Sequence, residues 1–252
     1  MVVIGIIVIM TLLLVPAFTS RKSSDEVTGA MSDVIDALQN ARTFAVANNT
    51  YVWVGFFEEN PGAVPTNPRS SGIGRIVILV ASSREGNRYK DTDVDTTEPH
   101  AFYPPSASPT PIPASDKNPV LLSQVGKLTK IENSHLAVLP QTDLPRPAVA
   151  AEYQIGADEF TLHPPTLGAS PVPNPTTFNY PLSAAAPDVE YTFTKIIEFN
   201  PRGEALKIVD LPTQLVEIGL QPTHGNTVDG NSRNIVAIQV SGATGKTKVY
   251  RP

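Results

Sequence analysis

The sequence predicts an α+β fold, in which a long hydrophobic N-terminal helix packs on a globular domain of antiparallel β-strands. Three observations lead to this prediction. The first 18 of the 252 residues carry no charge. A segment with the periodicity of an amphipathic helix follows directly. Beyond it, short β-branched and aromatic segments alternate with proline-rich stretches, as in a β-rich domain.

The uncharged segment is long enough to reach almost across a bilayer. As a helix it spans roughly 27 Å, against a hydrocarbon core of about 30 Å. On its residues alone it fits a cleaved secretory signal, a single-span anchor or a buried core helix. A signal needs basic residues before the apolar run and a small-x-small cleavage site, which are missing here. For a plain anchor, Arg21 and Lys22 after the run would keep the C-terminal part in the cytoplasm.

The next segment continues the helix with one apolar face. Its apolar residues recur in steps of three and four: Val27, Met31, Val34, Leu38, Ala41 and Ala45. Polar residues lie mostly on the other sides: Ser32, Asp33, Asp36, Gln39, Asn40 and Arg42. Asn48 and Asn49 are expected to end the helix, because Asn tolerates the left-handed conformation. The two segments together predict one helix of about 70 Å.

The rest of the chain predicts strands joined by turns and loops. We expect strands or short elements in residues 51–57, 75–80, 120–128, 135–139, 159–162, 191–199, 205–209, 215–220, 235–240 and 246–250. Short connections between the last of them favour antiparallel pairing. Proline-rich loops are expected at about 59–72, 82–119 and 163–187. The chain therefore divides into a first helix half (1–22), an amphipathic half (23–50) and a β-rich domain (51–252).

Composition excludes several classes of function. The net charge of −5 comes without a basic stripe, so nucleic acid is not an expected partner. The absence of cysteine excludes a disulfide framework, thiolate-ligated iron–sulfur clusters and a thiol nucleophile. The 25 prolines are about twice the usual share and concentrate in the expected loops.

The N-terminal run resembles the first helix of type IV pilins and type II secretion pseudopilins. Val2-Val3-Ile4-Gly5-Ile6 matches their Val-Val-Ile-Gly-Ile stretch, and Pro16 matches a helix-weakening proline further along. The leader, the cleavage glycine and the glutamate of that pattern are absent, so we expect Met1 to be an internal start. By this resemblance the polymerisation helix comprises Val2, Val3, Ile4, Gly5, Ile6, Ile7, Ile9, Leu12, Leu13 and Pro16.

Three further segments resemble the pseudopilin H (FimT-like) family. IIEFNPRGEA at 196–205 is similar to a strand–turn–strand element, and 235–252 is similar to the closing hairpin of that family. Residues 37–54 resemble its junction between helix and strand. The long proline-rich middle departs from the family core, and it resembles a Verrucomicrobia gene-cassette family of proline-rich, pilin-like chains.

The resemblance implies a non-enzymatic, pilin-like subunit that assembles through its N-terminal helix. It implies other pilin or pseudopilin subunits and inner-membrane lipid as partners, with a prepilin peptidase and an assembly platform for a full-length precursor. The expected location is the inner membrane, with a single pass and a periplasmic C-terminal domain, and then a filament. The alternative is a membrane-anchored periplasmic binding or adhesive β-domain that does not polymerise. An anchored hydrolase has no candidate nucleophile in the sequence.

Other motifs offer little chemistry. Residues 242–247 resemble a P-loop, but Val240 stands where its first glycine belongs and no helix follows, so a hairpin turn is expected. No cofactor is expected apart from possible calcium at Asp91, Asp93 and Asp95, whose alternating carboxylates are suitable ligands. An EF-hand would also need Gly at Thr96 and Glu at Phe102, which favours a solvated acidic loop. The four histidines, which are His100, His135, His163 and His224, lack zinc-site spacing.

Overall fold

The computed structural model describes the backbone of residues 2–84, 86, 122–161, 178–182, 188–206 and 215–252. Within these ranges it describes side chains from Ser24 onward, except those of Glu159, Thr161 and Leu206. The described elements are α1 (Val2–Ala47), β1 (Val52–Glu59), β2 (Gly74–Ser83), β3 (Leu122–Gln124), β4 (Thr129–Ala137), η2 (Ala151–Tyr153), η3 (Asp158–Thr161), β5 (Phe178–Tyr180), β6 (Tyr191–Phe193), β7 (Lys195–Phe199), β8 (Ala205–Leu206), β9 (Leu215–His224), β10 (Thr227–Val228), β11 (Val236–Ser241) and β12 (Thr247–Tyr250).

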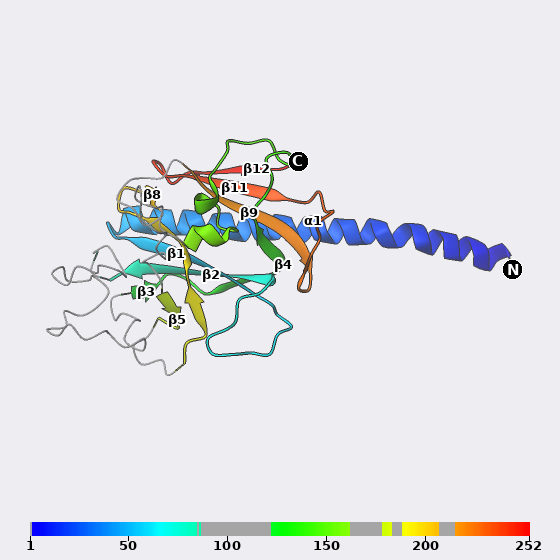
Figure 1. Cartoon of the computed structure of the whole chain (residues 1–252), viewed down its shortest axis with the longest axis horizontal. Helices are drawn as coiled ribbons and strands as arrows, with labels where there is room; N and C mark the ends of the chain where they lie inside the picture. The colour runs from blue at the N-terminus through cyan, green and yellow to red at the C-terminus, as the bar shows by residue number, and fades with distance from the viewer. Residues whose placement is uncertain (1, 85, 87–121, 162–177, 183–187, 207–214) are drawn as a thin grey trace.

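Most strands form one antiparallel sheet that curves around α1. Its strand order is β12-β11-β9-β4-β2-β1-β7-β8. The two ends of this order come together, because the backbone N–H of Ala205 in β8 donates to the carbonyl of Gly242 in the β11–β12 turn at 2.7 Å. Figure 1 shows α1 running along the sheet and extending beyond it toward the N-terminus. The sheet is therefore a trough closed at the C-terminal end of the helix.

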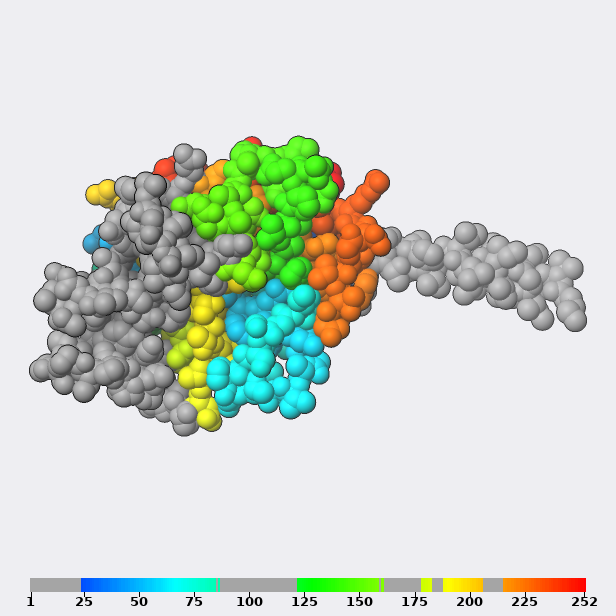
Figure 2. Space-filling model, viewed as in Figure 1, coloured from blue at the N-terminus to red at the C-terminus, as the bar shows by residue number. Residues whose placement is uncertain are grey.

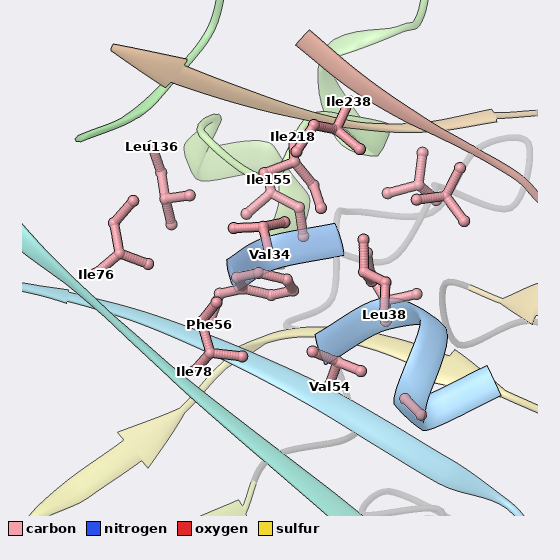
Figure 3. Close-up of a cluster of buried hydrophobic side chains, with 14 of the residues drawn as sticks. Val34, Leu38, Val54, Phe56, Ile76, Ile78, Leu136, Ile155, Ile218 and Ile238 are labelled. Carbon is pink, nitrogen blue, oxygen red and sulfur yellow. The ribbon is translucent and has the colours of Figure 1, made fainter. Parts of the chain in front are cut away.

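The half of α1 whose side chains are described, residues 24–47, lies in this trough with its apolar face inward. Val27, Val34, Leu38, Ala41 and Ala45 are buried and Met31 is partly buried, which confirms the predicted amphipathic face. Figure 3 shows Val34 and Leu38 among side chains from several strands and from the loop that carries Ile155. The helix ends at Ala47, and Asn49 has the expected left-handed backbone with a φ of 48°.

The outer face of β1 and β2 holds a second apolar cluster, covered by the β5–β6 hairpin. The cluster contains Trp53, Val77, Leu79, Ala81, Leu122, Phe178, Tyr191, Phe193 and Ile196. Gly55 makes the close approach possible, since a Cβ there would lie 2.7 Å from Cζ of Phe178. Trp53, in the predicted strand 51–57, has no exposed surface.

A buried ion pair fastens the segment that follows β4 to the sheet. Arg146 donates to both carboxylate oxygens of Glu217 on β9, at 2.7 and 2.5 Å, and both side chains are almost fully buried. Its remaining donors reach the carbonyls of Leu139, Pro140 and Leu144. In Figure 2 this segment, in green, forms much of the upper front surface.

The predicted fold class is wrong. The expectation was an α+β fold built of a long hydrophobic helix packed on a β-rich domain, but the chain is mostly antiparallel β-sheet with one α-helix among its described residues. The physical reason is that the strands supply most of the buried core, whereas α1 exposes Asp25, Asp33 and Asp36 on the side away from the sheet. Its apolar face alone belongs to the core.

The predicted location is corrected as well. A single-pass inner-membrane anchor with a periplasmic C-terminal domain requires a spanning helix. No helix in the part of the chain whose side chains are described is both long and apolar enough to cross a membrane. Charged residues recur along this part of the helix, at Asp25, Glu26, Asp33, Asp36 and Arg42.

Most strand predictions are confirmed, with shifts at the ends. The segment 75–80 is central as expected, since β2 pairs with both β1 and β4. Thr194 interrupts the predicted strand 191–199 and separates β6 from β7. The predicted strand at 159–162 is wrong, because Asp158–Thr161 is a 3-10 helix that buries Phe160 against the α1 cluster. The loops expected at about 82–119 and 163–187 lie largely outside the described residues.

Both predicted turns are confirmed. Gly203, with a φ of 78°, donates its backbone N–H to the carbonyl of Asn200 at 2.8 Å. The Asn200 side-chain oxygen also accepts from the backbone N–H groups of Arg202 and Glu204. Residues 242–247 form the β11–β12 connection, in which Gly245 has a φ of 62°. This segment is a hairpin turn and has no P-loop geometry.

Candidate functional site at the neck of helix α1

The neck of α1 is the point where the helix enters the trough, and three distant segments meet there. Val27 is buried, and it is the first buried apolar residue of the helix from Ser24 onward, where side chains are described. Beside it, the Asn133 side-chain amide donates to Oε1 of Glu26 at 2.9 Å. Asn133 reaches the helix because β4 bulges there, and its φ of 54° is one that Asn adopts more readily than most residues. The bulge therefore connects the sheet to α1 at Glu26, where the helix enters the trough.

A hollow of about 290 Å³ opens at the neck. It is lined by Ser24, Val27, Arg233, Asn234, Ile235, Val236, Arg251 and Pro252. The Arg251 guanidinium donates to the hydroxyl oxygen of Thr28 at 3.0 Å, which is a neutral partner. Arg233 is exposed, and neither arginine has an ion pair within the described residues. The hollow is therefore a basic surface on the flank of α1.

The outward side of α1 forms an acidic stripe, which we define as Asp25, Asp33 and Asp36. All three are exposed, and none has an ion pair in the described part of the chain. Asp33 and Asp36 are three residues apart, a spacing at which like charges on a helix repel each other. The stripe is therefore a charged surface without a counter-charge.

A second polar cluster surrounds the buried carboxylate of Glu59 at the same end of the sheet. Oε1 of Glu59 accepts from Arg75 at 2.9 Å and from the hydroxyl of Tyr191 at 3.2 Å. Oε2 lies 3.6 Å from Nη1 of Arg69 and has no hydrogen-bond partner, although the residue is 1% exposed. Arg69 also pairs with Glu190, beside β6. The cluster holds the loop after β1 and the β5–β6 hairpin on the sheet.

Titration in this cluster follows from burial and charge. Burial raises the pKa of Tyr191, and the carboxylates of Glu59 and Glu190 raise it further. Burial lowers the pKa of Arg75, but its hydrogen bonds with Glu59 and Glu132 outweigh burial, so the pKa is raised overall. The position of the Glu59 side chain between two guanidinium groups suits structural support of the loop and the hairpin.

A third group of titratable side chains includes His135, Glu58 and Lys195. Nδ1 of His135 lies 2.6 Å from Oε1 of Glu58. Burial lowers the pKa of Lys195, while Asp158 and Glu58 oppose this shift. The adjacent hydroxyl of Ser134 donates to the backbone carbonyl of Glu132 and is therefore not aligned with His135. The arrangement offers a paired acid and base without an aligned nucleophile.

The predicted site residues are only partly described. The backbone of the predicted polymerisation residues, Val2 to Pro16, is helical within α1, and Pro16 does not interrupt it. Their side chains lie outside the described residues, as do Asp91, Asp93, Asp95, His100 and His163. His224 lies at the end of β9, 3.9 Å from Asp229. Among the residues that the structure describes, no three metal-ligating side chains come together.

Sequence patterns missed the neck itself. Asp33 and Asp36 are identifiable as polar positions of the helix, but nothing local in the sequence brings Arg233 and Arg251 beside Ser24 and Thr28. The signal that was available is the helical period, which places Asp36 opposite the buried face. Comparisons with protein-family models, with curated proteins and with solved structures found no match.

Proposed function

We propose that this chain is a pilin-like structural subunit, which assembles with further pilin-type subunits through α1. The observation that carries the proposal is the two-part character of this helix. The half of α1 from residue 24 to 47 packs one apolar face against the inside of the sheet. The preceding residues are uncharged and apolar by sequence, and Figure 1 shows this part of α1 extending beyond the sheet.

Burial energies support assembly through this segment. Each Ile, Leu or Val that passes from water into a packed interface contributes roughly 1.5–3 kcal/mol. Association costs about 4–15 kcal/mol in lost translational and rotational freedom. Burial of several of the aliphatic residues between Val2 and Leu13 is therefore enough to offset that cost. The resemblance of Val2-Val3-Ile4-Gly5-Ile6 and of the C-terminal turns to pilin-type proteins supports the same function.

The test is whether the chain assembles and whether the apolar run is required. The full chain is purified in detergent, the detergent is removed, and the products are examined by sedimentation and electron microscopy. Ile9→Asp places a charge in the run and should abolish assembly. Val64→Asp is the matched control, because Val64 is 85% exposed in a loop, and this variant should assemble normally.

Circular dichroism shows whether both variants retain the β-rich fold. Regular assemblies of the unchanged chain and of Val64→Asp, together with loss of assembly in Ile9→Asp, would support the proposal. A folded, unassembled unchanged chain would overturn it in favour of a domain that does not polymerise. Normal assembly of Ile9→Asp would also overturn it, because the apolar run would then have no role.

A further inference from the structure

The acidic stripe and the basic neck are complementary surfaces on one chain. Asp33 and Asp36 repel each other on an exposed helix face, and no cation of the described residues pairs with them. Arg233 and Arg251 lie at a hollow without a carboxylate partner among the described residues. A cation brought to the stripe would relieve the repulsion, and a carboxylate brought to the hollow would pair with the arginines.

Asp33 and Asp36 are the two members of the stripe that lie further from the neck, and they do not pair with the arginines of their own molecule. The neck contacts α1 at Ser24 to Thr28, whereas Asp33 and Asp36 lie about one and a half to three turns further along, roughly 8–18 Å at 1.5 Å per residue. They also point in different directions around the helix, since successive residues turn by about 100°. The fit is therefore between one molecule and the next.

We propose that the basic neck of one copy receives Asp33 and Asp36 of a neighbouring copy. This inference rests on the proposed function and names the contact that aligns the subunits. The contact joins two different surfaces, so it is heterologous and repeats from copy to copy into a helical array or a ring. The separation of these aspartates from the neck along α1 sets an axial stagger of about 8–18 Å between neighbours.

Charge reversal tests this contact. Asp33→Lys with Asp36→Lys, or Arg233→Glu with Arg251→Glu, should each raise the critical concentration for assembly about tenfold, because several partly exposed ion pairs become repulsive. The four changes together should restore assembly to within about threefold of the unchanged chain. Asp143→Lys, at an exposed loop position, is the matched control and should leave the critical concentration unchanged.

Cysteine pairing tests the geometry. The chain has no cysteine, so Asp36→Cys with Arg233→Cys introduces the sole pair of thiols. These positions are too far apart to bond within one chain, since a disulfide needs Cα atoms closer than about 7 Å. Under oxidation this variant should form ladders of linked copies when assembled, and Asp143→Cys with Arg233→Cys should not.

The outcomes separate this inference from the function on which it rests. Ladders from the Asp36–Arg233 pair together with rescue by the four-residue reversal would support the contact. Normal assembly without ladders, or without sensitivity to charge reversal, would overturn the contact and leave the assembly function standing. Failure of the unchanged chain to assemble would overturn both.

Discussion

The ion pair of Arg146 and Glu217 gives the sharpest prediction for stability. In Arg146→Met the carboxylate of Glu217 stays buried and keeps only the amide of Gln239 as a donor, at 2.8 Å. Three backbone carbonyls lose the same guanidinium. Breaking a buried pair by removal of one partner costs about 3–5 kcal/mol. Domains of this kind are stable by about 5–15 kcal/mol, so the loss takes a large share of the total.

Urea denaturation measures this effect. Arg146→Met should lower the free energy of unfolding by about 3–5 kcal/mol with an unchanged slope against urea. Arg146→Met with Glu217→Met should regain most of the loss, because no unpaired charge then remains buried. Arg84→Met, at an exposed arginine whose Nε donates to Ser123, is the control and should change stability by less than about 0.5 kcal/mol. A single variant that loses less than about 1 kcal/mol, or a double variant as unstable as the single one, would refute the reasoning.

Three further predictions concern the core, a turn and pH. Leu38→Ala should lower the free energy of unfolding by about 2–5 kcal/mol, because Leu38 is 1% exposed in the cluster between helix and sheet. Thermal or urea unfolding measures this loss, and a loss under about 1 kcal/mol would contradict the packing. Gly245→Ala should lower the free energy of unfolding by more than about 1 kcal/mol, because the φ of Gly245 is 62° and a Cβ there would lie 2.2 Å from the carbonyl oxygen of Gly203. An unchanged free energy of unfolding would show that the turn adapts. Lys195→Met should stabilise the protein at pH 7. Burial lowers the pKa of Lys195 below its unfolded value of 10.5, so folding at a lower pH buries a charged ammonium group. The unchanged protein recovers this loss as pH rises toward 10.5, so the advantage should shrink in unfolding curves from pH 7 to 10, and a constant advantage would contradict the assignment.

Local periodicity accounts for what could be predicted. The three- and four-residue steps from Val27 to Ala45 identified the buried helix face, and β-branched segments such as 75–80 identified central strands. The 18-residue uncharged run dominated the interpretation of the whole chain. It led to the wrong fold class, since the strands dominate the structure. It also led to the wrong location, since the part of α1 whose side chains are described has only one apolar face.

Contacts between distant residues could not be predicted. Arg146 and Glu217 are 71 positions apart, and Arg251 and Thr28 are 223 apart. The error at 159–162 has the same origin. Its local sequence favours a strand, but the preceding Gln154 already pairs with Glu217, and the chain then turns so that Phe160 reaches the α1 cluster. Tertiary packing overrides weak strand propensity in such short segments.

The closed end of the trough has a mechanical consequence. Where β8 meets the β11–β12 turn, the Arg42 side chain also donates to the carbonyl of Thr244 at 2.9 Å, so helix and both sheet edges are joined. Tension applied to the N-terminal end of α1 pulls the helix along the trough, parallel to its axis. The contacts of its apolar face then bear the load simultaneously in shear, and they are not peeled apart one by one. At the far end, the hydrogen bond from Arg42 to Thr244 tethers the helix to the sheet edges against this displacement.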